Sequence, residues 1–258
     1  TAASLLSGCL QPAIMAVTPT PDVTQVDLVA ADWELLAPGL ERRALFPGGN
    51  YPLTQFTVIR IDPAHFTFRA HYRPGEPLSL TEWRDVLPDA VGFINANFFD
   101  AQARILGLLI SDGISYGSAY SNRGGVFYTL GDDIGIRSTV VEPYGGETYD
   151  QAVQAFPMLV SGGTAAFSNS GADRASRRTA IGLDSSGRVL VIVSSSLIGM
   201  RLTDLSAYLP DAGLDIVEAV NLDGGGSTLL YLNAASGVQV PSFDPVPAVL
   251  AIYPKAGS

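Results

Sequence analysis

The stretch IVEAVNLDGGGSTLLYL (residues 216–232) sets a polar, glycine-rich segment between two apolar runs. Each apolar run has the length and composition of a buried strand. Asn221 and Asp223 precede Gly224–Gly226, and Ser227 follows them. A plain hairpin turn needs one or two glycines, so the third glycine and the clustered polar side chains favour a functional site.

Short apolar runs separated by turn residues recur along the chain. The 27 Gly and 17 Pro of the 258 residues favour many turns over long helices. TVIRIDPAHFTFRAHY (57–72) predicts a hairpin around Asp62-Pro63, and residues 179–196 predict another across Asp184–Gly187. VGFINANFF (91–99) reads as a further strand. The expected class is α+β: mostly antiparallel β-sheet with a few short helices in a single domain.

Three short helices at most are expected. A capping box at Ser79–Glu82 starts the first, which Pro88 ends. The second is expected at 149–155. Leucines at helical spacing predict the third, at 202–209, with Thr203 as its N-cap.

The charge and the scarcity of Cys and His exclude several functions. The formal net charge of −10 excludes general nucleic-acid binding, so an anionic substrate would need a local cationic pocket. One cysteine excludes a disulfide framework and thiolate zinc sites, and two histidines cannot form a three-histidine metal site.

The N-terminal residues predict a lipid anchor. LLSGC (5–9) resembles a bacterial lipobox, whose cysteine here is Cys9, and the Pro- and Thr-rich segment 16–24 reads as a tether. Residues 1–24 are therefore expected to be a residual signal with its tether, and 25–258 the functional domain. The expected location is extracytoplasmic, with the membrane contacted only through the anchor at the bacterial cell envelope.

Two further segments carry candidate binding residues, and three enzyme motifs are excluded. RASRRTA (174–180) gathers three arginines that suit phosphate or carboxylate, or else form a solvated basic loop. Asn95 and Asn97 share a strand face, so their amides could bind sugar hydroxyls or satisfy backbone groups. The glycine run is neither a phosphate-binding P-loop nor a dinucleotide fingerprint. GISYG (113–117) has no histidine after it and is rejected as a nucleophile elbow.

Several motifs together resemble one family. In chain order they are WELLAPGLERRAL (33–45), INANFFD (94–100), GLLISDG (107–113), RGGVFYTL (123–130), QAFPMLVSGG (154–163), RRTAIGLDSSGRVLVIV (177–193) and VNLDGGGST (220–228). They resemble the phosphodiester glycosidase family, which includes the catalytic domain of N-acetylglucosamine-1-phosphodiester α-N-acetylglucosaminidase. The resemblance covers roughly residues 33–253. The chain departs from relatives at NANFF (95–99), where many carry NGGFF or NGTFF, and at Arg177, where proline is frequent.

The resemblance implies hydrolysis of a sugar-1-phosphodiester, similar to a GlcNAc-1-phosphodiester, at the anomeric carbon. The products would be free sugar and a phosphomonoester. Asp223 and Arg178 are then the expected catalytic residues, with Asp223 as general base or electrostatic stabiliser. The expected substrate-binding residues are Asn95, Asn97, Arg123, Thr179, Asn221, Gly224, Gly225, Gly226 and Ser227.

No cofactor is required by this reaction, although Asp100, Asp112 and Asp223 could supply oxygen ligands to Ca²⁺. The partner expected is a small-molecule or glycan phosphodiester. Two other functions stay open: a non-catalytic glycan- or exopolysaccharide-binding lipoprotein, and another hydrolase acting on cell-envelope sugar-phosphate polymers.

Overall fold

A computed structural model describes the chain at residues 1, 32–168, 171, 173–233 and 237–255. Cys9 and the predicted tether at 16–24 lie outside the described residues. Within the described ranges, no helix is long and apolar enough to cross a membrane.

Three sheets make up the described part of the molecule, and every strand pair in them is antiparallel. The eight-stranded sheet has the order β1 (Glu34–Ala37), β2 (Leu40–Leu45), β3 (Phe56–Ile61), β14 (Val189–Ser194), β13 (Thr179–Asp184), β15 (Ile216–Asn221), β11 (Met158–Ser161) and β12 (Thr164–Ala165). One five-stranded sheet has the order β7 (Ile114–Gly117), β6 (Leu108–Ser111), β10 (Gln151–Ala155), β8 (Gly125–Leu130) and β9 (Asp133–Ser138). The other has the order β17 (Val238–Val240), β16 (Leu230–Leu232), β5 (Gly92–Asn95), β18 (Ala248–Pro254) and β4 (Phe66–Tyr72).

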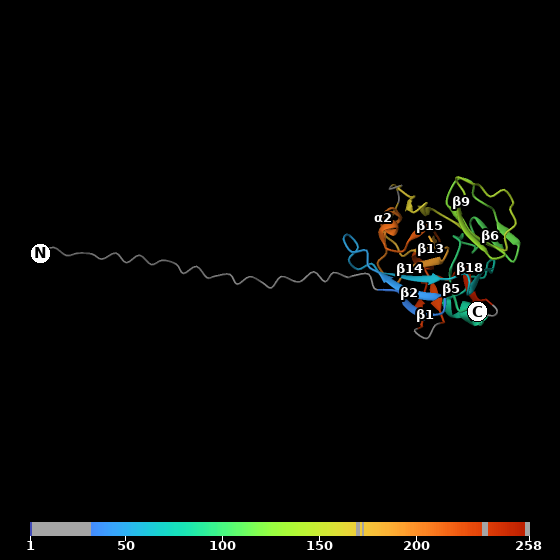
Figure 1. Cartoon of the computed structure of the whole chain (residues 1–258), viewed down its shortest axis with the longest axis horizontal. Helices are drawn as coiled ribbons and strands as arrows, with labels where there is room; N and C mark the ends of the chain where they lie inside the picture. The colour runs from blue at the N-terminus through green and yellow to red at the C-terminus, as the bar shows by residue number, and fades with distance from the viewer. Residues whose placement is uncertain (2–31, 169–170, 172, 234–236, 256–258) are drawn as a thin grey trace.

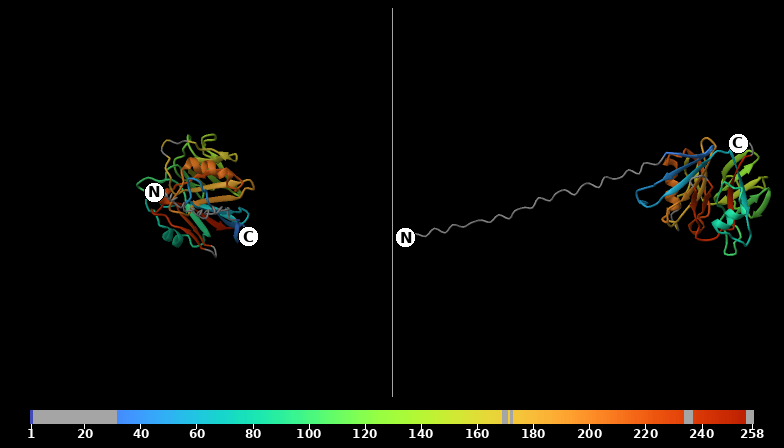
Figure 2. Two further views of the ribbon diagram at one scale, coloured as in Figure 1. Left: turned by 90° about the vertical axis from the view of Figure 1, so that its left-hand side faces the viewer. Right: turned by 90° about the horizontal axis from the view of Figure 1, so that it is seen from below.

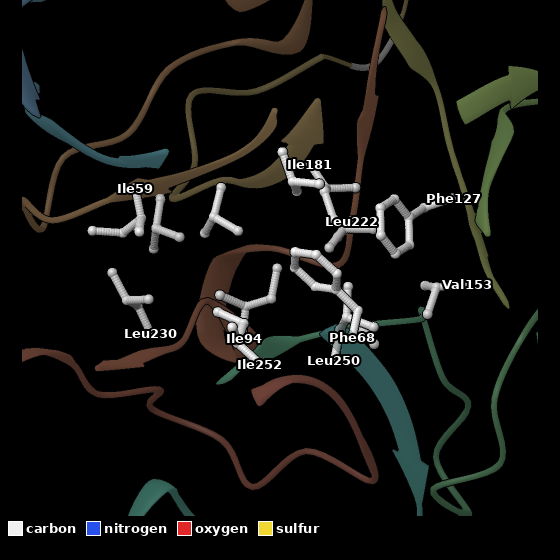
Figure 3. Close-up of a cluster of buried hydrophobic side chains, with 14 of the residues drawn as sticks. Ile59, Phe68, Ile94, Phe127, Val153, Ile181, Leu222, Leu230, Leu250 and Ile252 are labelled. Atoms are coloured by element: carbon white, nitrogen blue, oxygen red, sulfur yellow. The ribbon is translucent and has the colours of Figure 1, made fainter. Parts of the chain in front are cut away.

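All three sheets contribute to one hydrophobic core. Ile59 and Ile181 come from the eight-stranded sheet, Ile94 and Leu250 from the β5 sheet, and Phe127 from the β8 sheet (Figure 3). These side chains are fully or almost fully buried, and such burial of apolar surface is the main stabilising contribution to a fold of this kind. Seen from below, the blue and orange strands of the large sheet stand to one side of the green β6–β10 strands (Figure 2).

Two short α-helices cover the outer faces of two sheets. α1 (Leu80–Val86) buries Trp83 against the β5 sheet. α2 (Leu202–Tyr208), with the 3₁₀ turn Leu209–Asp211, packs Leu205 and Leu209 on the large sheet (Figure 1). The expected mostly antiparallel β-fold with a few short helices is confirmed.

Two local predictions are confirmed and one hairpin prediction is wrong. The capping box of Ser79 and Glu82 is present, and β13 pairs with β14 as predicted. The segment 57–72 is not a hairpin, because β3 pairs with β2 and β14 while β4 pairs with β18 in another sheet. Asp62-Pro63 therefore lies in a connection between sheets.

Three other local predictions need correction. Residues 149–155 do not form a helix: β10 occupies 151–155 and pairs with β6 and β8. The strand expected at 91–99 ends at Asn95. Arg201, not Thr203, is the N-cap of α2, and no side chain of its own caps it.

Candidate active site

The glycine loop after β15 crosses from the large sheet to the β5 sheet, which excludes the reading of a plain hairpin. β15 and β16 lie in different sheets. Three backbone hydrogen bonds fix the crossing: Leu222 N–H donates to Thr179 O at 2.8 Å, Asp223 N–H to Ala96 O at 3.1 Å, and Gly225 N–H to Arg177 O at 2.8 Å. The loop is therefore held by the start of β13 and the end of β5.

Asn95 supports this loop from beneath. Its Nδ2 donates to the Asp223 carbonyl at 2.6 Å. Its Oδ1 accepts from the Thr179 hydroxyl at 2.7 Å and from the Leu229 N–H at 3.0 Å. Because Asn95 and Thr179 are fully or almost fully buried, these bonds replace water and fix the loop against both sheets. Both residues were expected to bind substrate, and the structure instead places them below the site.

The glycines of the loop allow neighbouring residues to pack closely against its backbone. A Cβ on Gly224 would lie 2.7 Å from the Arg177 carbonyl oxygen, and a Cβ on Gly226 would overlap the Asp244 carboxylate. The Gly224 N–H donates to Asp223 Oδ1 at 2.8 Å. Since the Gly225 N–H also bonds within the protein, neither of these two amides is free for the substrate that Gly224 and Gly225 were expected to bind.

A cavity of about 690 Å³ opens beside the loop. This volume suits a small organic ligand. Six of the predicted site residues line it: Arg123, Arg178, Asn221, Asp223, Gly224 and Gly225. They come from segments that lie as much as 102 positions apart in the chain, from Arg123 to Gly225, so the fold brings the carboxylate and both arginines to one cavity.

Asp223 is a buried carboxylate whose pKa is raised. Burial is the main cause that raises the pKa of Asp223 from 3.8 to about 6, and the negative charge of Asp244 also raises it. The hydrogen bonds from the Ser227 hydroxyl and the Gly224 amide act in the opposite direction and lower it. At pH 7 a carboxyl with this pKa is about nine-tenths ionised. Asp223 can therefore accept a proton near physiological pH.

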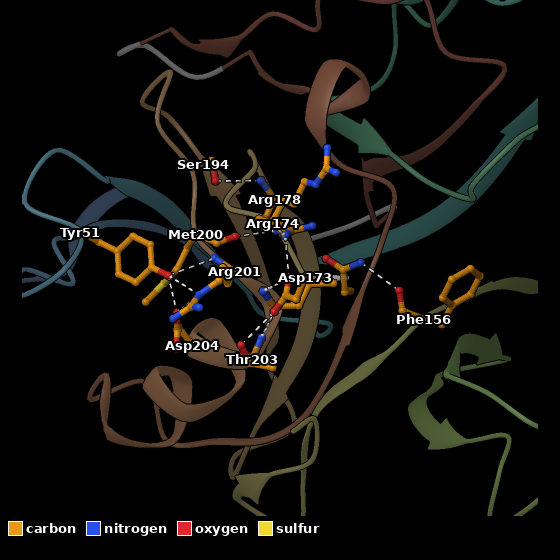
Figure 4. A network of polar contacts seen from close by, with 12 residues as sticks. Tyr51, Phe156, Asp173, Arg174, Arg178, Ser194, Met200, Arg201, Thr203 and Asp204 are labelled. Atoms are coloured by element: carbon orange, nitrogen blue, oxygen red, sulfur yellow. Dashed lines mark hydrogen bonds and ion pairs between the residues drawn. The ribbon is translucent and has the colours of Figure 1, made fainter. Parts of the chain in front are cut away.

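Arg178 reaches the cavity with a fixed orientation. Nε donates to Met200 O at 2.8 Å, and Nη2 to Arg174 O at 2.6 Å, with Asp173 Oδ1 at 3.3 Å (Figure 4). Among the described residues nothing bonds Nη1. Burial lowers the pKa of Arg178, which Asp173 counters, and guanidinium still remains charged. The N–H groups of Arg178 Nη1 are thus available to an anion.

Asp173 explains both the orientation of Arg178 and the start of α2. Its oxygens accept from Leu202 N–H at 2.9 Å and from Thr203 N–H at 2.7 Å. Burial opposes ionisation, but these bonds and Arg178 lower the pKa of Asp173 overall. A carboxylate at a helix N-terminus is stabilised by the unpaired N–H groups. Asp173 supplies from outside the helix the cap that Thr203 was predicted to provide.

Arg123 supplies a second positive charge at the cavity. Its guanidinium carbon lies 5.0 Å from the Tyr120 ring centroid and 5.5 Å from that of Phe156, both within cation–π range. Its Nε donates to Asn122 Oδ1 at 3.3 Å. No carboxylate of the described chain pairs with Arg123, so its charge is open to an anionic ligand.

An aromatic wall completes the cavity. Phe98 and Phe156 stack with centroids 4.5 Å apart, and Phe167 lines the same space. Asn221 donates Nδ2 to Phe156 O at 2.9 Å, while its buried Oδ1 has no protein partner in the described chain. The sequence pattern missed this wall, because Phe98 and Phe156 read there as ordinary apolar residues.

The remaining predicted residues lie away from the cavity. Asn97 is buried and donates Nδ2 to Leu108 O and Gln154 O, both at 3.0 Å. Arg177 is buried behind the loop, donates to Thr228 O and Pro241 O, and lies 4.7 Å from the Phe243 ring. Gly226 and Ser227 do not line the cavity, although Ser227 bonds Asp223. Of the arginine run, only Arg178 contributes its guanidinium.

Two of the three aspartates considered for Ca²⁺ form ion pairs with arginines. Asp100 pairs with Arg104 at 2.8 Å and Asp112 with Arg69 at 2.6 Å. In the ranges that the structure describes, no three His, Cys, Asp or Glu side chains are placed to hold a metal ion.

The phosphodiester glycosidase family model matches residues 88–253. The fold is similar to the auto-inhibited catalytic domain of zebrafish N-acetylglucosamine-1-phosphodiester α-N-acetylglucosaminidase, with a TM-score of 0.65 and 19% identity over 87% of this chain and 86% of that one. The fold is also similar to that of a hypothetical protein from Synechocystis, with a TM-score of 0.61 and 15% identity over 84% of this chain and 62% of that one. A putative exported protein from Burkholderia pseudomallei K96243 is similar with a TM-score of 0.53 and 11% identity, over 78% of this chain and 74% of that one. No curated protein sequence matches the chain.

Proposed function

Since this chain belongs to the phosphodiester glycosidase family, we propose that it hydrolyses a sugar-1-phosphodiester at the anomeric carbon, with an α-GlcNAc-1-phosphodiester as the model substrate. One observation carries the proposal. Asp223, with its pKa raised to about 6, lines the same cavity as Arg178 and Arg123. A phosphodiester of a sugar needs this combination: cations for the phosphate and a carboxylate for the anomeric carbon.

The arginines bind the phosphate in this proposal. Nη1 of Arg178 and the guanidinium of Arg123 neutralise the diester and the extra charge that develops as the phosphomonoester leaves. Because a phosphomonoester has a second pKa near about 6, its departure needs little protonation. The site therefore needs no general acid at the leaving oxygen.

Asp223 acts at the sugar. The C1–O bond breaks, its electron pair leaves with the phosphate, and a water oxygen adds to C1 while ionised Asp223 takes the proton of that water. The same carboxylate stabilises positive charge on the ring in the transition state. Phe98 and Phe156 offer an apolar face for the sugar ring, and the unpartnered Oδ1 of Asn221 accepts from a hydroxyl.

The test is a panel of sugar-1-phosphodiesters incubated with and without chelator, in water enriched in ¹⁸O. Free sugar that carries the ¹⁸O is the expected product, because water attacks carbon. Sugar phosphate, or ¹⁸O in the phosphate, would instead identify a hydrolase that cleaves at phosphorus. Binding without turnover, unaffected by Asp223→Asn, would support a glycan-binding protein.

The lipid anchor at Cys9 is part of the proposal. Mass spectrometry of the full-length protein expressed in a bacterial host is expected to show an acylated Cys9. Cys9→Ser is expected to release the protein from the membrane fraction, and an unmodified Cys9 in membrane-bound protein would contradict the anchor.

A further inference from the structure

A second, apolar groove of about 420 Å³ continues from the candidate active site. Four residues line both spaces: Arg123, Gly124, Pro157 and Phe167. Arg123 therefore stands at the junction, with the cavity of Asp223 on one side and the groove on the other. A ligand whose phosphate lies at Arg123 has two directions in which its two substituents can extend.

Two of the apolar side chains that line the groove are largely exposed. Val140 is 56% exposed and Val141 is 85% exposed, and Met158, Ala166 and Phe167 continue the wall. Two adjacent valines at this exposure lose the stabilisation that burial would give them. Contact with an apolar ligand group would recover it.

The position of the valines is fixed by the backbone. The Thr139 hydroxyl donates to Arg123 O at 2.7 Å, and the Thr139 N–H to Gly124 O at 3.1 Å. Gly124 has a φ of 71°, and a Cβ there would overlap the Ala155 carbonyl. The turn that carries Val140 and Val141 is thus tied to the residue that holds the phosphate in the proposed function.

Apart from Arg123, the polar side chains that line the groove are two serines, and each already has one hydrogen-bond partner. Ser138 Oγ accepts from Val140 N–H at 3.4 Å, and Ser161 Oγ donates to Glu218 Oε1 at 3.3 Å. A sugar or another polar group along the valines would lose hydrogen bonds to water and find few side-chain partners to replace them. The chemistry of the groove favours an aliphatic chain.

We infer that the second alcohol of the phosphodiester is an aliphatic chain, which extends from Arg123 into the groove along Val140, Val141 and Phe167. The inference rests on the proposed function for the placement of sugar and phosphate. The leaving group is then a lipid-like alkyl phosphate rather than a sugar phosphate.

The experiment uses two ligand ladders, each with two to eight carbons in the alkyl chain. The first consists of alkyl diesters of α-GlcNAc-1-phosphate, read out as kcat/KM. The second consists of alkyl phosphate monoesters without sugar, read out as Kd by calorimetry, and it needs no catalysis. Each added methylene is expected to improve both quantities about two- to fourfold, in line with the transfer of a methylene from water.

The double variant Val140→Ser/Val141→Ser tests the location. Both positions are exposed, so the variant is expected to fold and to hydrolyse the two-carbon diester as the wild type does, while the slopes of both ladders flatten. Val86→Ser is the matched control, because Val86 is 48% exposed on α1, and it should keep the wild-type slopes.

Each outcome has a distinct meaning. Equal kcat/KM along the first ladder, with turnover retained, would overturn the aliphatic leaving group and leave the proposed function standing. No turnover, together with Kd values that fall with chain length, would reject the function and keep the groove. A flat monoester ladder, or a slope that the double variant retains, would overturn the groove itself, and self-association lost in the double variant would identify it as an interface between copies of the chain.

Discussion

The side-chain amide of Asn95, on β5, donates a 2.6 Å hydrogen bond to the main-chain carbonyl of Asp223, which follows β15 in another sheet. Through this bond the β5 sheet helps to fix the residue that we propose acts at the anomeric carbon. The orientation of the Asp223 carboxylate therefore depends on the packing of two sheets and not only on its own loop.

Asn95→Ala is expected to destabilise the protein and to lower activity. It leaves the Asp223 carbonyl, the Thr179 hydroxyl and the Leu229 N–H without their partner. With about 1–3 kcal/mol for each buried unsatisfied group, a loss of several kcal/mol in the free energy of unfolding is expected. Chemical denaturation measures it. Asn122→Ala, at an exposed position, is the control, and equal stability of the two variants would contradict the supporting role of Asn95.

Gly224→Ala and Gly226→Ala test why the loop contains glycine. A Cβ at Gly224 meets the backbone carbonyl of Arg177, which cannot move without shifting β13, whereas a Cβ at Gly226 meets the exposed side-chain carboxylate of Asp244, which can rotate away. Gly224→Ala is expected to cost about 1–3 kcal/mol more in stability than Gly226→Ala. The reverse order in thermal denaturation would show that the glycines serve another purpose.

Arg178→Gln is expected to lower kcat/KM about 10²- to 10³-fold, the typical effect of removing one donor to a developing charge. Arg178→Lys should recover part of this loss because it keeps the charge but not the planar fork. Arg174→Gln is the matched control: Arg174 is exposed and contributes only its carbonyl to Arg178. If Arg174→Gln and Arg178→Gln lower kcat/KM equally, Arg178 is not the phosphate ligand.

The pH dependence of kcat/KM reports on Asp223. Since the ionised form accepts the proton, kcat/KM is expected to fall tenfold per pH unit below the pKa of about 6. Asp244→Asn should move this limb to lower pH, because the Asp244 charge raises the pKa of Asp223. A limb that stays near the ordinary aspartate pKa of 3.8 would contradict the account.

The same pKa makes a prediction about stability. In the folded protein Asp223 holds its proton up to about pH 6, whereas in the unfolded chain it releases it near 3.8. The folded state therefore binds more protons in this window, and the contribution of Asp223 to stability decreases as pH rises through it, by up to about 3 kcal/mol. Asp223→Asn removes this dependence, so its stability relative to wild type should be higher at pH 8 than at pH 4. Urea denaturation at both pH values measures the difference.

The sequence predicted features that depend on near neighbours. The hairpin of β13 and β14 follows from the turn at Asp184–Gly187, and the start of α1 from its capping box. The polar residues around the glycines pointed to Asp223, which the structure places on a cavity wall with Arg178 and Arg123. The two arginines were predicted from motifs that resemble those of the family and occur in the same order.

Features that depend on distant partners could not be predicted from the sequence. Residues 149–155 contain Ala and Gln, which suit a helix, but β10 forms because β6 and β8 flank it. Gln151 accepts from Ala70 N–H at 3.0 Å and donates to Asp112 at 2.8 Å. Likewise Asp173 caps α2 from 29 positions upstream of Leu202, a relation that no local pattern shows.

The role of Asp223 at the anomeric carbon is tested by the release of free sugar by Asp223→Asn. The substrate is the methyl diester of α-GlcNAc-1-phosphate, and circular dichroism confirms that each variant is folded. Asp244→Asn is the matched control because Asp244 is a nearby exposed carboxylate. Wild type and Asp244→Asn are expected to release GlcNAc, whereas Asp223→Asn is expected to lose at least about 10³-fold in kcat. Turnover of folded Asp223→Asn near the wild-type rate would contradict this role.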